Sequence, residues 1–355
     1  MKPKHFFFSI LLLAVVASCV NRTGKSVSHT RNLVDTIGFA HLDWQMDSII
    51  GRLGFEAPSS PEGFRLAICP HDDYTYAGPL YPRIFSNLHA KTVILFGVAH
   101  KAAALGVENQ LVFGTFDQWK GPFGLIPVSS VREQILKRLD TDVYQVNDSL
   151  QQIEHSIEAL LPFMQYYRRD VEIVPILVPA MPYERMVEIA EKFAGVLDKI
   201  FTDKQWDWGK DVSLAISNDA VHYGDEDWGG RNFARYGSDS AGYQLAVGHE
   251  HEILDSCLLG ELTPERIKRF TEYTVEADNF RTYKWTWCGR YAVPFGLLTG
   301  YFLGEDLKAD PLNGDLKGYL TSIDHDTIPV SDLGMGRTAP AKLGHWVGYA
   351  AVEYR

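Results

Sequence analysis

The sequence predicts a single α/β domain with a mostly parallel central sheet flanked by helices. Short runs rich in Ile, Val and Leu have the length of strands that are buried on both faces, and segments of helical period separate them. Strands that alternate with helices favour a mostly parallel sheet that is covered on both sides. The 355 residues, 46% of them hydrophobic, are typical of an ordinary globular protein with a sizeable core.

The expected elements alternate along the chain. Central strands are expected over residues 65–69, 92–98, 172–178 and 212–217. Helices are expected over residues 82–89, 131–139, 154–167 and 183–200, and Ser129 and Ser130 are candidate caps of the second of these. Further helices are expected over 240–259, 264–275 and 290–303, the last interrupted by Pro294. Two closing strands are expected over 319–323 and 346–353.

Charge, cysteine content and missing motifs exclude several classes of protein. The net charge of −11 gives the chain no general attraction to nucleic acid, and four cysteines are too few for a disulfide scaffold. The sequence contains no CxxC pair, HExxH, GxSxG, P-loop or GxGxxG that opens a helix. Simple zinc ribbons, zincins, serine hydrolases and nucleotide-binding proteins therefore lack support.

The first residues have the pattern of an export signal. Lys2 and Lys4 precede an uncharged apolar run over residues 6–16, which is too short to span a bilayer as a helix. The run ends in Val-Ala-Ser-Cys19, which resembles a bacterial lipobox, where the peptide is cut before a cysteine whose sulfur carries lipid. The alternative is an ordinary signal peptide in which Cys19 has no role.

This pattern divides the chain into a lipoprotein signal peptide (1–18), a lipid-anchored tether (19–40) and the α/β domain (41–355). The mature protein is then expected on the periplasmic or cell-surface side, attached to a membrane through lipid on Cys19. Cys69, Cys257 and Cys288 remain in the domain. An odd number of cysteines in an exported protein leaves at least one thiol free or bound to metal.

Three of the expected central strands end in polar residues. The strand at 65–69 is followed by His71, the strand at 92–98 by His100, and the strand at 212–217 by Asp219 and His222. Because ligands of open α/β sheets bind at the carboxyl ends of the strands, these side chains are expected at one edge. Each histidine alone is more often structural, but three at equivalent strand ends favour a site.

Two neutral imidazoles with one anionic ligand form a common open metal site. Cys288, in the segment Trp-Cys-Gly-Arg, is a candidate for the anionic ligand. The alternative for Cys288 is a small buried apolar side chain, which is the commonest environment of a free cysteine.

The joint order of these motifs resembles the Memo family, also called AmmeMemoRadiSam system protein B. The resemblance covers residue 65 to the C-terminus, nearly all of the domain. It rests on residues 70–78 (Pro-His-Asp-Asp-Tyr-Thr-Tyr-Ala-Gly), 97–100 (Gly-Val-Ala-His), 154–158 (Glu-His-Ser-Ile-Glu), 174–178, 217–219 with 222–224, 288–290 (Cys-Gly-Arg) and 348–351.

The resemblance implies a fold similar to that of the class III extradiol dioxygenases of LigB type. It implies His71, His100 and Cys288 as metal ligands, with Asp219 and His222 in the same pocket and His222 at the position of the acid/base histidine. In the dioxygenases the third ligand is a carboxylate and the metal is Fe(II). A thiolate in its place would also suit copper, and zinc remains an alternative.

Further residues of the matching motifs are expected near the metal or the substrate: Asp72, Asp73, Tyr74, Glu154, His155 and Arg290. The family usually has Ala-Gly where this chain has Asp72 and Asp73, so the charge at the mouth changes or one carboxylate contacts the metal. Its Pro-Ser-His is Val-Ala-His100 here, and its Gly-Ser-Trp/Phe-Tyr-Pro element has no clear match around Trp44.

Other polar clusters are expected to be solvated, namely His249-Glu250-His251 within a helix and Asp324-His325-Asp326 in a turn. Four tryptophans could form an aromatic wall, but packing is the more common role: Trp206, Trp208, Trp285 and Trp287.

Three functions fit these residues. The first is a metal-dependent oxidoreductase related to extradiol dioxygenases, in which His222 moves a proton and Asp219 orients it or the substrate. The second is a non-enzymatic metal- or ligand-binding protein of a cell-surface assembly. The third is a metal-dependent hydrolase, in which a metal-activated water attacks the substrate. The thiolate and the resemblance favour the first, and the small-molecule substrate is not specified by the sequence.

Overall fold

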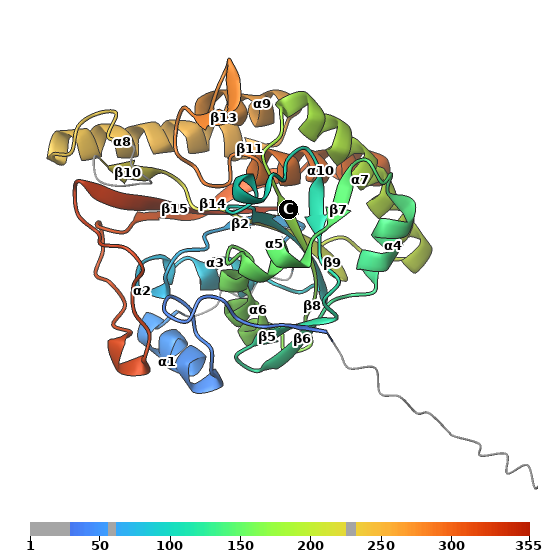
Figure 1. The fold of residues 1–355 in the computed structure, drawn as a ribbon, viewed down its shortest axis with the longest axis horizontal. Coiled ribbons are helices and arrows are strands. Elements are labelled where there is room, and N and C mark those ends of the chain that lie inside the picture. Colours follow the sequence, from blue (N-terminus) through green and yellow to red (C-terminus); the bar gives the residue numbers. More distant parts are fainter. Residues whose placement is uncertain (1–28, 56–61, 225–231) are drawn as a thin grey trace, which may run out of the picture.

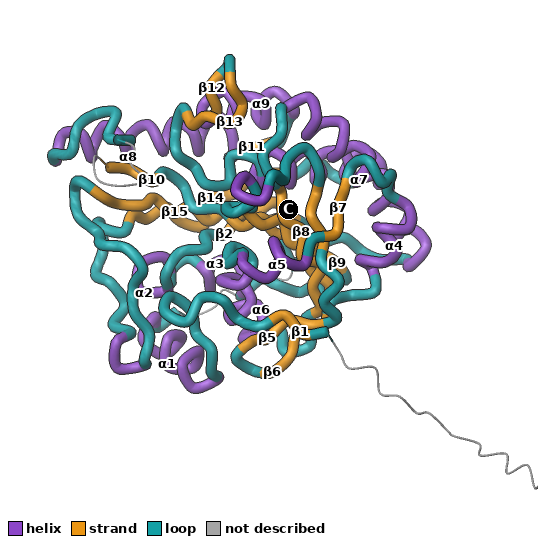
Figure 2. Tube along the Cα trace, viewed as in Figure 1, coloured by secondary structure: helices purple, strands orange, loops and turns teal. Residues whose placement is uncertain are grey.

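The structure is a computed structural model that describes residues 29–55, 62–224 and 232–355. One large sheet forms its centre, and helices lie on both faces of the sheet (Figures 1 and 2). The α/β class and the single domain predicted from the sequence are confirmed. The expected signal peptide and Cys19 lie outside the described residues.

The four central strands are parallel and adjacent, in the order β2 (Leu66–Cys69), β9 (Val212–Ser217), β3 (Thr92–Val98) and β8 (Glu172–Val178). In register, Ile94 of β3 pairs with Leu214 of β9 and with Val174 of β8. These strands match the expected ones to within one residue. Every residue in them except Glu172 is buried, which explains why each is visible in the sequence as a largely apolar run.

Antiparallel strands extend the sheet on both sides, so the sheet is parallel mainly at its centre. On one side β15 (His345–Tyr354) pairs with β2, β14 (Asn313–Thr321) and β10 (His222–Gly224), and β11 (Gly260–Glu261) pairs with β14. On the other side β4 (Leu111–Phe113) is antiparallel to β8 and parallel to β7 (Tyr144–Val146). No α-helix crosses over between β14 and β15, and a parallel pair would need such a crossover.

The two faces of the sheet carry separate hydrophobic cores, because successive side chains of a strand point to opposite faces. Leu66 and Ile68 of β2 belong to one core, whereas Ala67 and Cys69 belong to the other. The first core is covered by α4 (Val131–Arg138), α7 (Tyr183–Lys204), α8 (Ser240–Ile253), α9 (Pro264–Thr274) and α10 (Ala292–Leu307). The second is covered by α1 (Asp43–Leu53), α2 (Tyr74–Ala77), α3 (Tyr81–Phe85), α5 (Asp148–Ile153) and α6 (Leu161–Tyr167).

Several helix predictions need correction. The segment expected to be helical over 154–167 begins as a 3-10 turn, η2 (Glu158–Leu160), and becomes α-helical only in α6. Ser130 precedes α4 but its side chain makes no capping hydrogen bond. Pro294 lies in the first turn of α10, where its missing N–H costs no helical hydrogen bond, so it does not interrupt the helix. α8 continues into a π-helical turn, η3 (Leu254–Leu258).

The sequence analysis missed two small sheets and some short turns. One small sheet contains β1 (Thr30–Arg31), β5 (Gln118–Gly121) and β6 (Gly124–Pro127), and the other is the β12 (Val275–Glu276) and β13 (Asn279–Tyr283) hairpin. Short 3-10 turns occur at η1 (Ala103–Leu105) and η4 (Ser331–Leu333). These segments are short and partly polar, so they lack the apolar runs that marked the central strands.

Residues 29–40 belong to the folded domain, contrary to the expected tether over 19–40. β1 pairs in parallel with β5, and the side chain of Arg31 is buried in an ion pair with Glu158 and lies over the ring of Trp119. The polar composition of this segment suggests solvent exposure, but the charge of Arg31 is neutralised inside the protein. Within the described part of the chain, no helix is both long and apolar enough to cross a bilayer.

Candidate metal centre

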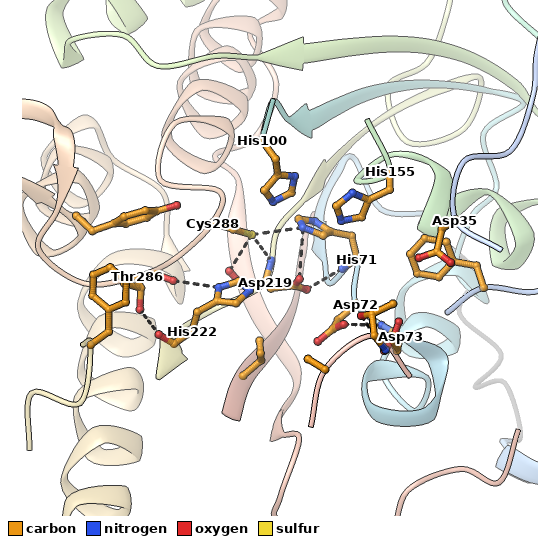
Figure 3. A pocket seen from close by; sticks show the side chains of 16 residues that line it. Asp35, His71, Asp72, Asp73, His100, His155, Asp219, His222, Thr286 and Cys288 are labelled. Atoms are coloured by element: carbon orange, nitrogen blue, oxygen red, sulfur yellow. Dashed lines mark hydrogen bonds and ion pairs between the residues drawn. The ribbon is translucent and has the colours of Figure 1, made fainter. Parts of the chain in front are cut away.

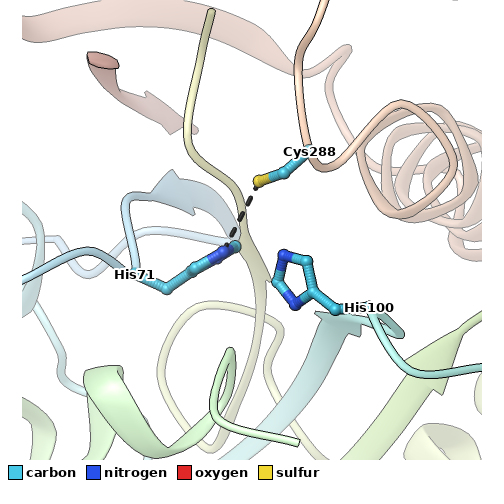
Figure 4. A group of neighbouring side chains, drawn as sticks. All are labelled: His71, His100 and Cys288. Carbon is cyan, nitrogen blue, oxygen red and sulfur yellow. Dashed lines mark hydrogen bonds between the residues drawn. The ribbon is translucent and has the colours of Figure 1, made fainter. Parts of the chain in front are cut away.

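The carboxyl ends of the central strands bring the expected polar residues together. His71 follows β2, His100 follows β3 and Asp219 follows β9, all at one edge of the sheet. Cys288 comes from the segment that precedes α10 and faces the two histidines (Figure 4). One ligand atom from each of His71, His100 and Cys288 lies within 4.8 Å of the other two. Two imidazole nitrogens and one sulfur therefore converge on a space that could hold a metal ion.

His71 presents its Nε2 atom to this space. Its Nδ1 lies 2.7 Å from the hydroxyl of Ser217, and that hydroxyl donates its own hydrogen to the carbonyl of Ser156 at 2.6 Å. Ser217 must therefore accept the hydrogen bond from Nδ1–H of His71. The proton then resides on Nδ1, and the lone pair of Nε2 faces Sγ of Cys288 at 3.5 Å.

His100 is held in the same tautomer by Glu154. Oε1 of Glu154 lies 2.9 Å from Nδ1 of His100, and Oε2 accepts from the backbone N–H of His100 at 2.7 Å. The backbone N–H groups of His155 and Ser156 also donate to Oε1. Burial alone would raise the pKa of Glu154, but these contacts with His100 and its neighbours hold it at about 2. Glu154 is thus an anion that leaves Nε2 of His100 available to a metal.

Cys288 is fixed by the backbone of Asp219. The N–H of Asp219 donates to Sγ of Cys288 at 3.1 Å, and the N–H of Cys288 donates to the carbonyl of Asp219 at 3.3 Å. Burial, with the charge of Asp219 nearby, raises the pKa of the Cys288 thiol well above its usual range. Without a metal this side chain is therefore a thiol, and a bound cation would take the place of its proton.

Asp219 and His222 complete the edge of the site. Oδ1 of Asp219 accepts from the backbone N–H of His71 at 2.8 Å, and its Oδ2 lies 3.3 Å from Nε2 of the same residue. His222 begins β10, and its Nδ1 lies 3.3 Å from the carbonyl of Thr286. Burial lowers the pKa of His222 to about 4. At neutral pH His222 is therefore an uncharged base.

A cavity of about 400 Å³ opens onto these groups (Figure 3). The expected residues His71, His100, His155, Asp219, His222 and Cys288 all line it. The sequence analysis missed the remaining wall, which is formed by Asp35, Phe39, Phe233, Tyr283, Thr286, Thr338, Ala339 and Val347. These residues come from loops and strand ends far apart in the sequence, and no motif marks them.

Asp72 and Asp73 also line the cavity, at a distance from the metal ligands. The hydroxyl of Tyr349 donates to Asp72 at 2.5 Å, and Thr338 donates to Asp73 through its backbone N–H and its hydroxyl. Burial and the neighbouring charge of Asp72 raise the pKa of Asp73 to about 7. Neither carboxylate belongs to the convergent group of ligand atoms that the described residues form, so these two acids shape the wall.

His155 lies flat against His100. The two ring centroids are 4.9 Å apart and the ring planes differ by 9°. Burial lowers the pKa of His155 to about 4, with the charge of His100 as the next cause. His100, Glu154 and His155 also bring ligand atoms together, but Glu154 already accepts several hydrogen bonds there. His155 is therefore a neutral side chain that lines the cavity.

Two expected site residues lie elsewhere. Tyr74 is buried in the core of the second face, where its hydroxyl donates to the carbonyl of Ala159 at 2.6 Å. The guanidinium of Arg290 lies 3.3 Å from the ring centroid of Tyr283, and Arg290 does not line the cavity. Neither residue lines the cavity, which gives no support to direct substrate contact, and the alternative expectation that they support the site from behind stays a prediction. Arg290 packs on Tyr283, and Tyr283 does line the cavity.

The remaining candidates of the sequence also lie outside the cavity. His251 is exposed as expected, but Glu250 is fully buried, which corrects the expectation of a solvated cluster. His325 pairs with Asp324 at 2.8 Å and is partly shielded from solvent. None of the four tryptophans named in the sequence analysis lines the cavity at the histidines, in agreement with a packing role.

The fold and the site define a class of protein: an α/β domain in which two histidines at the carboxyl ends of parallel strands and a cysteine before α10 form a candidate metal site. The chain belongs to the Memo-like family, whose sequence model matches residues 40–331. A MEMO1 family protein of Methanosarcina barkeri is 31% identical over 159 residues, which are 44% of this chain and 54% of that protein. A MEMO1 family protein of Aquifex aeolicus is 30% identical over 174 residues, 48% of this chain and 58% of that protein. The matched part of the chain thus spans little more than half the length of these curated relatives.

Proposed function

We propose that this Memo-like protein binds one Fe(II) or copper ion through His71, His100 and Cys288 and acts as an oxidoreductase on a small molecule. The observation that carries this proposal is the convergence of two imidazole nitrogens and one sulfur within 4.8 Å. Each imidazole has its Nδ1 engaged by a buried partner, Ser217 or Glu154, so each offers the same nitrogen to the ion.

The donor set fits a redox-active transition metal. Imidazole suits iron, copper and zinc, and a thiolate adds softness that favours copper and iron over magnesium or calcium. Three protein ligands leave coordination positions open toward the cavity. A bound ion would supply the electron-transfer chemistry that side chains alone lack.

The surrounding residues support proton transfer and substrate orientation. His222 lines the cavity and is neutral at physiological pH, so it can accept a proton from a substrate hydroxyl. Asp219 fixes the backbone of His71 and the thiol of Cys288, which keeps the ligands in place. Phe39 and Tyr283 give the cavity apolar walls, and its volume of about 400 Å³ suits a small molecule.

Metal analysis of the full-length chain tests the metal set. Protein purified without oxygen is expected to carry about one iron or copper per chain, and His71→Ala, His100→Ala and Cys288→Ala are each expected to lose it. His251→Ala is a matched control, because His251 is an exposed histidine on α8. A folded wild type that takes up no metal after reconstitution contradicts the proposal.

Substrate screening separates the remaining functions. Oxygen consumption with phenolic or other reducing substrates, lost in His222→Ala but with metal retained, supports the oxidoreductase. Zinc in the same site together with ester or amide turnover would indicate a hydrolase instead. Bound metal without any turnover would indicate a binding protein.

We also propose that the chain is exported and anchored through lipid on Cys19, on the basis of the lipobox-like segment alone. Mass spectrometry of the protein from bacterial membranes is expected to find an N-terminus at Cys19 carrying lipid. Cys19→Ser is expected to abolish the lipid, and an unmodified Cys19 in the mature protein contradicts this part of the proposal.

A further inference from the structure

Glu250 is a fully buried carboxylate that the proposed chemistry does not use. It lies on α8, between the half-buried His249 and the exposed His251. Its side chain has no solvent exposure, and among the described residues no lysine, arginine or histidine forms an ion pair with it. A buried carboxylate without a cation is expensive, so its hydrogen-bond partners must stabilise it.

Four donors from three segments converge on Glu250. The indole N–H groups of Trp285 and Trp287 both donate to Oε1, at 2.6 and 2.7 Å. The backbone N–H of Val221 donates to Oε2 at 3.1 Å, and the hydroxyl of Tyr319 lies 3.3 Å from the same oxygen. One carboxylate therefore joins the segment before Cys288, the segment before His222 and strand β14.

Two of these contacts are made by residues that are adjacent in sequence to residues of the candidate site. Trp287 directly precedes Cys288, and Val221 directly precedes His222. Val221 and Trp287 also form an isolated antiparallel bridge, so the two segments lie side by side. The segment that carries the sulfur and the segment that carries the proposed base are therefore both hydrogen-bonded to Glu250.

We infer that Glu250 is a positioning residue, which holds the Cys288 sulfur against His71 and His100 by binding Trp287 and Val221. This inference rests on the proposed metal-binding function of the same site. We call these four hydrogen bonds the Glu250 clamp. In Glu250→Gln, the remaining oxygen can still accept from the two indoles, but the NH2 group in place of the other oxygen cannot accept from Val221 N–H or from Tyr319. The clamp therefore loses the hydrogen bonds on one of its two oxygens.

The first test uses Co(II) as a spectroscopic probe of the full-length chain. Wild type with Co(II) is expected to show a thiolate-to-metal absorption band that Cys288→Ala lacks. Glu250→Gln is expected to shift or weaken this band and to bind Co(II) about tenfold less tightly, as is typical when a supporting residue of a metal site is lost. Trp287→Phe, which keeps an aromatic ring but removes the donor, is expected to change the band in the same way.

Glu252→Gln is the matched control, since Glu252 is an exposed acid on the same helix. It is expected to leave the band and the affinity unchanged. An unaltered band in both Glu250→Gln and Trp287→Phe would overturn the inference.

The second test needs no metal. The rate at which iodoacetamide alkylates Cys288 is compared with the rate for Cys69, which is buried in β2 and has no contact with Glu250. Glu250→Gln is expected to accelerate the reaction of Cys288 alone, because only its segment is released. Equal acceleration at both cysteines would indicate general unfolding and overturn the inference. A wild type without the Co(II) band would refute the proposed function, while this comparison would still decide the role of Glu250.

Discussion

Oε1 of Glu154 lies 2.9 Å from Nδ1 of His100, and the same carboxylate also accepts from the backbone N–H of His100. One buried anion thus sets both the ring orientation and the tautomer of a candidate metal ligand. The Nδ1–H bond also places a negative charge behind the ring, on the side opposite to Nε2. Glu154 is therefore the part of the site whose removal should most weaken metal binding without removing a ligand.

We predict that Glu154→Gln weakens metal affinity by about 10- to 100-fold while the fold is retained. The amide keeps the shape of the side chain but loses the charge and one acceptor. Isothermal titration of the metal-free protein with Co(II) measures the affinity. Glu191→Gln makes the same change at an exposed position of α7 and should bind Co(II) like the wild type. Equal affinities of Glu154→Gln and wild type would refute the proposed role.

A second prediction compares two buried serines of β9. Ser217 accepts from Nδ1 of His71, whereas Ser213, at the other end of the strand, donates to the carbonyl of Phe64 at 2.7 Å. Ser217→Ala and Ser213→Ala should each lower the free energy of unfolding by about 1–3 kcal/mol, because each leaves a buried carbonyl unpaired. Only Ser217→Ala should also weaken Co(II) binding.

Urea denaturation and metal titration of both variants measure the two effects. If Ser213→Ala weakened Co(II) binding as much as Ser217→Ala, the loss would reflect general destabilisation and not the tautomer of His71.

The central strands, and the meeting of His71, His100 and Asp219 at one edge of the sheet, could be predicted from the sequence for one physical reason. Parallel strands buried on both faces leave an apolar run, and the polar residue that follows each run must lie at the same edge. The positions of His71 and His100 could therefore be predicted from the strands that they follow. The third candidate ligand, Cys288, follows no strand of the sheet, and its assignment depended on the resemblance to a known family.

The cavity wall and the clamp could not be predicted, because they depend on contacts between distant segments. Asp35 lies in the segment that was expected to be a tether, and the contacts of Arg31, Val34 and Asp35 with Glu158 attach this segment to the domain beside the cavity. Glu250 lies between two histidines on α8, where the apolar residues show little helical periodicity and do not mark the buried face. Its burial depends on the indoles of two tryptophans more than 30 residues away, as the separations of 35 and 37 residues show.

A third prediction concerns the stability of the metal-free protein in acid. Burial lowers the pKa of His222 to about 4, whereas in the unfolded chain the histidine pKa is near 6.5. Between these values the unfolded state binds more protons than the folded state, so the contribution of His222 to stability rises with pH and is lost as pH falls. His222→Asn should therefore reduce the pH dependence of the unfolding free energy by up to about 1.4 kcal/mol per pH unit between pH 6.5 and 4.

Denaturant unfolding of both proteins at several pH values in this window gives the difference directly. Comparison with the wild type is needed because Asp73, with a raised pKa of about 7, acts in the opposite direction. His251→Asn, at an exposed position, is the control. A constant difference between wild type and His222→Asn across the window would contradict the neutral state of His222 in the folded protein.

The last prediction concerns the N-terminal segment. Arg31 and Glu158 form an ion pair in which each side chain is 1% exposed, and Glu158 also accepts from the backbone N–H groups of Val34 and Asp35. Removing the guanidinium would leave Glu158 buried without its partner, so Arg31→Ala should cost about 3–5 kcal/mol of unfolding free energy. Because Asp35 forms part of the cavity wall, the same change should also raise the mobility of that wall.

Arg52→Ala provides the matched control, since Arg52 pairs with Asp332 at the surface, where solvent screens the charges. Its effect on the unfolding free energy should be small. Urea denaturation measures both variants, and hydrogen exchange at Asp35 to Phe39 reports on the wall. If Arg31→Ala were as stable as Arg52→Ala and left exchange unchanged, residues 29–40 would be dispensable for the domain. Their packing against Glu158 would then have no influence on the cavity.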